Sequence, residues 1–130
     1  MTVLAPFPDI EKVVRDIVEP LATPYTELPT SFPVPAVRIT RTGGRDDGVT
    51  DYPTVEITTY GASRAEAWEV DGLIRQRVLA SGATAVNNVM VDFARTVTPT
   101  QQLPDPREDI RVVTSSYRFG LRRPSPLRNS

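Results

Sequence analysis

Apolar side chains near the N-terminus recur at helical spacing and predict a first helix. The charged residues fall on the opposite side of this stripe, which consists of Ile10, Val13, Val14, Ile17 and Leu21. Asp9 is the predicted N-cap, and Pro20 should end the helix near Glu19, because proline lacks a backbone donor and crowds the preceding turn. Prolines at 24, 29, 33 and 35 follow. They leave room for one short edge strand near residues 25–28.

Two segments with alternating apolar and polar residues, 36–42 and 54–60, predict adjacent antiparallel strands. The stretch RTGGRDDGVTDYP, residues 41–53, joins them. We expect it to be a hairpin connection in which Gly43–Gly44 and Asp47–Gly48 supply the positive φ angles that tight turns need.

A second helix is predicted from Ser63 to Ser81. Ser63 is a typical N-cap with Glu66 at the capping-box position, and Gly82 is a typical C-terminal stop. One apolar stripe faces the core and consists of Ala67, Val70, Ile74 and Val78. A second stripe, roughly 100–120° away by the helical period, consists of Trp68, Gly72 and Leu79. This second stripe either covers the edge of the sheet or contacts another protein.

The C-terminal part contains two further predicted strands. Residues 88–98 place Val89, Val91, Phe93 and Val97 on one face, and residues 99–109 read as a loop or hairpin arm. In the last strand, 110–121, the apolar residues change parity between Val112 and Tyr117. This change predicts either a bulge near residues 114–116 or a strand that is covered on both faces.

The order of elements indicates an α+β fold, with two helices on one face of a mostly antiparallel sheet of four to five strands. A chain of 130 residues fits one domain. We assign this domain to residues 1–123 and expect residues 124–130 to form a disordered basic tail.

The composition narrows the possible chemistry. The chain contains neither cysteine nor histidine, which excludes a thiolate nucleophile and every imidazole-based general base or metal site. Its 16 acidic residues do not single out a catalytic pair. We therefore predict no enzymatic activity, no catalytic residues and no cofactor.

The polar stretch 41–53 resembles neither common ligand-binding loop. A phosphate loop needs a lysine and a following helix, whereas Gly43, Gly44 and Gly48 precede a predicted strand. Asp46, Asp47 and Asp51 lack the ligand spacing of an EF-hand. Binding of a divalent ion there is the minor alternative to a plain hairpin.

Nucleic-acid binding is a further alternative. The net charge of −1 and the pI near 5.4 argue against a protein that holds many phosphates. Arg118, Arg122 and Arg123 lie beside Tyr117 and Phe119, as in a stacking platform, but strand alternation directs both rings toward the core. The sequence contains no membrane-spanning run and no typical signal peptide, so we expect a soluble protein made in the cytoplasm.

The spacing R-x-G-G…D-x-P-x-V…Y-G-x-x-R-x-x-A connects Arg41 to Ala67. With PFPDIEKVV before it and SSYRFGLRR after it, this pattern resembles the tail terminator proteins of long-tailed (siphovirus-type) actinobacterial phages. The similarity spans residues 6–123.

This resemblance implies a non-enzymatic virion protein at the tail top, or neck, assembled in the host cytoplasm. It implies a homo-oligomeric, hexameric ring that caps the tube of major tail tube protein and stops its polymerisation. The ring would meet the head–tail connector protein and let the genome DNA pass without specific binding. Another neck component, such as a head-completion or head–tail adaptor protein, is the alternative.

The resemblance transfers roles only by region. The interface candidates are the loop Gly43–Asp51, the second stripe of the 63–81 helix, the arm 103–109 and the basic end of the last strand. They comprise Gly43, Gly44, Arg45, Asp46, Asp47, Asp51, Trp68, Arg75, Leu79, Asp105, Arg107, Arg122 and Arg123.

Overall fold

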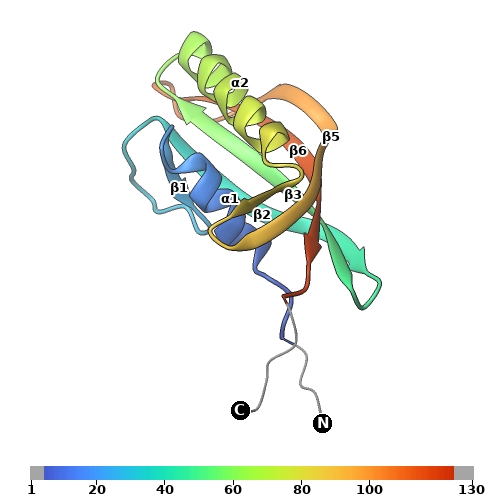
Figure 1. The fold of residues 1–130 in the computed structure, drawn as a ribbon. Helices are drawn as coiled ribbons and strands as arrows, with labels where there is room; N and C mark the ends of the chain where they lie inside the picture. The colour runs from blue at the N-terminus through green and yellow to red at the C-terminus, as the bar shows by residue number, and fades with distance from the viewer. Residues whose placement is uncertain (1–4, 125–130) are drawn as a thin grey trace.

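The computed structural model describes residues 5–124, which form two helices and a single six-stranded sheet. Both helices lie on one face of the curved sheet (Figure 1). The strand order is β1-β2-β3-β6-β5-β4, with β1 parallel to β2 and the other pairs antiparallel. The elements are α1 (Ile10–Val18), β1 (Thr23–Tyr25), β2 (Ala36–Asp46), β3 (Thr50–Gly61), α2 (Arg64–Ala80), β4 (Thr84–Val86), β5 (Val89–Leu103) and β6 (Arg111–Arg122).

The α+β class is confirmed, but the predicted count of four to five strands is wrong. The strand that sequence analysis missed is β4, which has only three residues and pairs with the start of β5. Three residues are too few to show a period of two. Asn87 and Asn88, which join β4 to β5, both have positive φ, as a tight hairpin turn requires.

The helix ends agree with the predictions. The Asp9 carboxylate accepts from the Glu11 amide, and α1 ends at Val18, just before Glu19 and Pro20. At α2 the Ser63 hydroxyl accepts from the Glu66 amide, while the Glu66 carboxylate accepts from the Ala62 amide. The short edge strand lies at Thr23–Tyr25, about two residues before its predicted place.

The polar stretch 41–53 is mostly strand rather than loop. β2 continues to Asp46 and β3 begins at Thr50, so the connection is only residues 47–49. Gly44 and Gly48 have positive φ as predicted, but Gly43 and Asp47 do not. The resulting hairpin projects beyond the body of the protein (Figure 1).

β5 differs most from its predicted pattern, because its pairing with β6 shifts register at three places. At each shift β5 contains one more residue than the facing part of β6. Such an inserted residue reverses the face on which the following side chains lie. Val91 is therefore buried in the core, Phe93 lies against Gly120 on the opposite face, and Val97 is 49% exposed. The prediction that these three share a face is wrong.

The apolar residues of β6 change from even to odd positions because both faces of this strand are covered by other side chains. β6 keeps one continuous register with β3 from Arg111 to Arg118, so it carries no bulge against that strand. Tyr117 and Phe119 pack under the helices, whereas Val112 joins a smaller cluster on the other face with Ala36 and Tyr60. The second of the two predicted explanations is correct.

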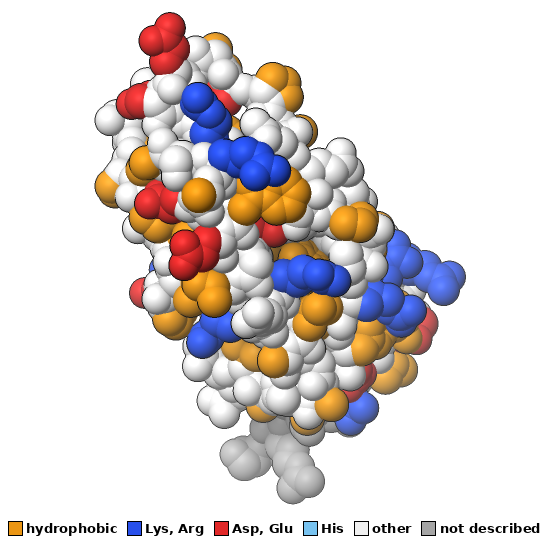
Figure 2. Space-filling view, turned by 90° about the horizontal axis from the view of Figure 1, so that it is seen from above, with side chains coloured by type: hydrophobic (Ala, Val, Ile, Leu, Met, Phe, Trp, Pro, Cys, Tyr) orange, Lys and Arg blue, Asp and Glu red, His pale blue; other side chains and the backbone are white. Residues whose placement is uncertain are grey.

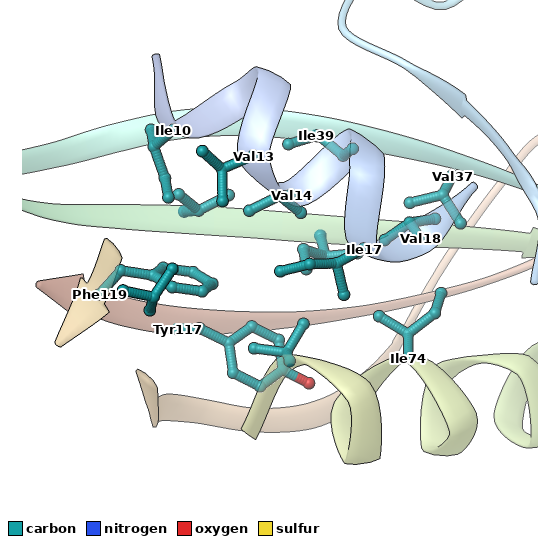
Figure 3. Packing of buried hydrophobic residues seen from close by; sticks show 14 of the residues in the cluster. Ile10, Val13, Val14, Ile17, Val18, Val37, Ile39, Ile74, Tyr117 and Phe119 are labelled. Carbon is teal, nitrogen blue, oxygen red and sulfur yellow. The ribbon is translucent and has the colours of Figure 1, made fainter. Parts of the chain in front are cut away.

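The main core lies between the two helices and the sheet. Figure 3 shows α1 side chains such as Val14 and Ile17 directed at Ile39 of β2 and at Tyr117 of β6. Burial of this apolar face is the main force that holds both helices against the sheet. The Arg77 guanidinium also donates to the Ile17 carbonyl at 3.0 Å, which links α2 to α1.

Candidate functional site

The projecting β2–β3 hairpin is organised by its own aspartates. Asp46 accepts from the Gly48 amide, and one oxygen of Asp47 accepts from the amides of Val49 and Thr50 at 2.9 and 2.7 Å. The Tyr52 hydroxyl donates to the other Asp47 oxygen at 3.1 Å. The backbone donors lower the pKa of Asp47. These carboxylates thus build the turn.

Asp51 is the one hairpin candidate that is buried, with 3% exposure. Its two oxygens accept from the Arg41 guanidinium at 2.8 and 2.9 Å, in a bidentate pair across the hairpin. The hydrogen bonds to Asp51 raise the pKa of Arg41. Gly43, Gly44, Arg45, Asp46 and Asp47 are exposed, and Val49 at the turn is 64% exposed. The hairpin therefore offers a braced, solvent-facing end with one apolar side chain.

The second stripe of α2 lies at the surface. Arg75 and Leu79 are exposed, whereas Trp68 is half-buried with the Arg64 guanidinium 5.2 Å from its ring centre. Within residues 5–124 the buried indole nitrogen of Trp68 has no hydrogen-bond partner. Figure 2 shows apolar side chains lying among basic ones on the side of the molecule that it displays. A partly apolar surface of this kind is suited to contact with another protein.

The segment 104–110 between β5 and β6 is held by Arg107. Its guanidinium donates two hydrogen bonds to Asp105, at 2.7 and 2.6 Å, and lies 5.1 and 5.5 Å from the ring centres of Phe32 and Tyr60. The Arg107 hydrogen bonds lower the pKa of Asp105 to about 2. Asp105 and Arg107 therefore form an ion pair within the arm, and the contacts of Arg107 with Phe32 and Tyr60 fix the arm against the rest of the protein.

The basic end of β6 is not a stacking platform. Tyr117 and Phe119 are fully buried, as alternation predicted. Arg122 is exposed and pairs with Asp92 at 3.1 Å. Arg123 is half-buried: it donates to the Ala5 carbonyl at 3.1 Å and lies 4.2 Å from the ring centre of Phe7. Of the basic tail expected at residues 124–130, residues 125–130 lie outside the described residues.

The structure brings the candidate residues together only within each region. Arg41–Asp51, Asp105–Arg107 and Arg122–Asp92 are three separate ion pairs. In residues 5–124, no group of three or more acidic side chains is arranged to hold a metal ion. An open groove of about 410 Å³ between α1 and β4 is lined by residues that include Asp16, Arg77 and Asn87. Among the described residues, no helix has the length and apolarity needed to span a bilayer.

Sequence reasoning missed one arrangement on the sheet face away from the helices. Arg95 of β5 pairs directly opposite Arg118 of β6, beside a stacked pair of rings, Tyr52 and Phe93, with centres 6.0 Å apart. The sequence contains no direct signal for this pairing, because the bulges in β5 decide which of its residues faces Arg118.

The fold and these surfaces define a small α+β protein whose exposed features are braced loops and partly apolar patches. The sequence matches the family described as phage tail termination protein over residues 6–128. The chain therefore belongs to this family and is a structural protein of the virion tail. No curated protein matches the sequence.

The fold has a counterpart among solved structures. A chain from a structure titled "Virion of native gene transfer agent (GTA) particle" aligns with a TM-score of 0.55 and 11% identity. The alignment covers 85% of this chain and 84% of that chain. At this identity the similarity establishes a shared fold.

Proposed function

We propose that this protein forms a closed ring, with six subunits, on top of the tail tube. The ring ends polymerisation of the tube protein and joins the tail to the head-side connector, while the genome passes through its lumen without specific binding. The observation that carries the proposal is the family match over residues 6–128. The protein acts through shape and assembly, without catalysis.

The surfaces of the subunit are compatible with this role. A closed ring requires two different patches on each subunit, related by a rotation. The projecting hairpin, the α2 stripe with Trp68 and Leu79, and the arm 103–109 are separate candidates for these contacts and for contacts with the tube and the connector. The exposed candidates are Gly43, Gly44, Arg45, Asp46, Asp47, Arg75, Leu79 and Arg122.

Capping of the tube provides the direct test. Purified protein is mixed with assembling tail tube protein, and tube lengths are measured by negative-stain microscopy. We expect short tubes with a ring at one end, and a six-fold average of that ring. Tubes of unchanged length, or a subunit located away from the upper end of the tail in a virion map, would exclude this function and favour another neck component.

A pair of variants tests the hairpin surface. Val49→Ser removes exposed apolar area at the turn and should reduce capping, while the melting temperature stays within about 2 °C, because an exposed surface change alters stability little. Met90→Ser is the matched control, since Met90 is also exposed but lies outside the proposed regions. Equal capping by both variants would remove the hairpin from the interface.

A further inference from the structure

Two arginines that have no acidic partner within residues 5–124 face each other on the sheet face that the helices leave uncovered. Arg95 and Arg118 are directly paired across β5 and β6, and both are exposed. Tyr117 and Phe119 flank Arg118 and belong to the core, so strand alternation directs Arg118 away from the helices. Like charges directly opposite each other on neighbouring strands repel. The pair therefore favours an anionic group lying over it.

Both guanidinium groups are held in place. Arg118 donates to the Thr54 hydroxyl at 3.1 and 3.4 Å, and Arg95 lies 4.3 Å from the ring centre of Phe93. Within residues 5–124 neither forms an ion pair, whereas Arg122 nearby is paired with Asp92. This arrangement provides preorganised hydrogen-bond donors for carboxylates.

Exposed carboxylates lie at the opposite end of the same β5–β6 hairpin. Glu108 and Asp109 are exposed in segment 104–110 and form no ion pair within the described residues. The Asp105–Arg107 pair, resting on Phe32, braces the segment that carries them. Its carboxylates are thus displayed from a fixed structure.

We propose that Glu108 and Asp109 of one subunit bind the Arg95–Arg118 pair of the next subunit. The proposal rests on the ring proposed above and specifies one of its contacts. The two patches differ and lie at opposite ends of one hairpin, as a head-to-tail ring interface requires. Complementary charge fixes the register of such a contact.

A second copy fits this face better than nucleic acid does. Glu56 of β3 lies on the same sheet face as Arg118, and Asp92 of β5 is paired with Arg122 near the end of β6, so a phosphate backbone would meet carboxylates as well. The exposed Glu108 and Asp109 of the chain itself are acidic groups of the kind that the pair requires.

Engineered cysteines test the contact directly, since the chain has no cysteine of its own. The double variant Asp109→Cys/Arg118→Cys is assembled on tail tube and oxidised. We expect a ladder of disulfide-linked oligomers that ends at the subunit number of the ring. The control is Asp109→Cys/Arg38→Cys, since Arg38 is exposed on the same sheet face but on β2. Assembled rings without a ladder, or equal ladders from both pairs, would overturn the proposal.

Charge reversal gives an independent readout. Arg95→Glu/Arg118→Glu should raise the concentration for half-maximal assembly at least about tenfold, since like charges then face each other across the contact. Glu108→Arg/Asp109→Arg should do the same, and combining all four changes should restore assembly. Circular dichroism and melting temperature verify folding.

The outcomes separate this inference from the ring itself. Failure of the unmodified protein to cap tubes would overturn both proposals. If rings form and all charge variants assemble equally, only this contact is excluded. If the arginine variants assemble normally but lose DNA binding, the pair serves nucleic acid and the proposal is again overturned.

Discussion

Replacing Gly44 with alanine should destabilise the hairpin severely. Gly44 has a φ of +117°, and an added Cβ would lie 2.3 Å from the Tyr52 carbonyl oxygen and 2.7 Å from the Pro53 Cα. Both are backbone atoms of the partner strand, so relief requires β2 and β3 to separate. Movement of β3 is restricted, because Asp51 and Thr54, on either side of Tyr52 and Pro53, are paired with β6.

The magnitude follows from these two costs. A non-glycine residue in this backbone region costs roughly 1–3 kcal/mol, and the contact with the backbone adds to it, so we expect a loss of about 2–4 kcal/mol. At roughly 3–5 °C per kcal/mol for a chain of this size, the melting temperature should fall by about 6–20 °C. Tube capping should fall as well, because the braced end of the hairpin is lost.

Gly43→Ala is the matched control. Gly43 has no positive φ, and an added Cβ would meet nothing within 4 Å. Its replacement should change stability by less than about 1 kcal/mol, and glycine is itself unfavourable within a strand. Urea denaturation at constant pH measures both variants. Equal stability of the two variants would show that the close approach at Gly44 does not constrain this hairpin.

Two further predictions concern buried or paired charges. Asp71 is 1% exposed and accepts hydrogen bonds from the hydroxyls of Thr100 and Ser115. Burial raises the pKa of Asp71 above its ordinary value. Ionisation of Asp71 therefore lowers the free energy of unfolding as pH rises above about 4. Asp71→Asn should therefore be more stable than the parent at pH 7, with the difference shrinking toward pH 4; a difference that is independent of pH would contradict this. Arg107→Ala should cost about 1–2 kcal/mol by removing the packing on Phe32 and Tyr60. Because Arg107 lowers the pKa of Asp105 to about 2, the charge-dependent part of this loss of stability should disappear as pH falls from about 4 to 2. Arg107→Lys keeps the positive charge and should therefore retain part of the stabilising interaction with Asp105 at pH 7.

Local patterns predicted the elements that bury one regular face. α1 has a clean apolar stripe bounded by Asp9 and Pro20, and α2 has a capping box at Ser63 and Glu66. β2 and β3 alternate with a period of two. In each case the signal lies within a few consecutive residues, and the same physical rule sets both the pattern and the structure.

Among the candidate site residues, sequence reasoning located exposed regions but not their internal partners. It could not predict that Asp51 is buried under Arg41, or that Arg107 rests on rings from two other segments. These contacts join residues on different strands or in distant segments, and the register of the strands decides which side chains meet. The interface roles of the exposed candidates stay predictions that the capping assays can test.

By itself, the sequence determined the two helices, the β2–β3 hairpin, the α+β class and the absence of thiol and imidazole chemistry. Only the tertiary structure decided the course of β5, where the first of three register shifts, between Val91 and Phe93, moves Phe93 and Val97 off the face that simple alternation assigns. A bulge reverses every side chain after it, yet it depends on pairing with β6, so it leaves no trace in β5 alone. The Arg95–Arg118 pair, and any contact it makes in an assembled tail, is a product of that pairing.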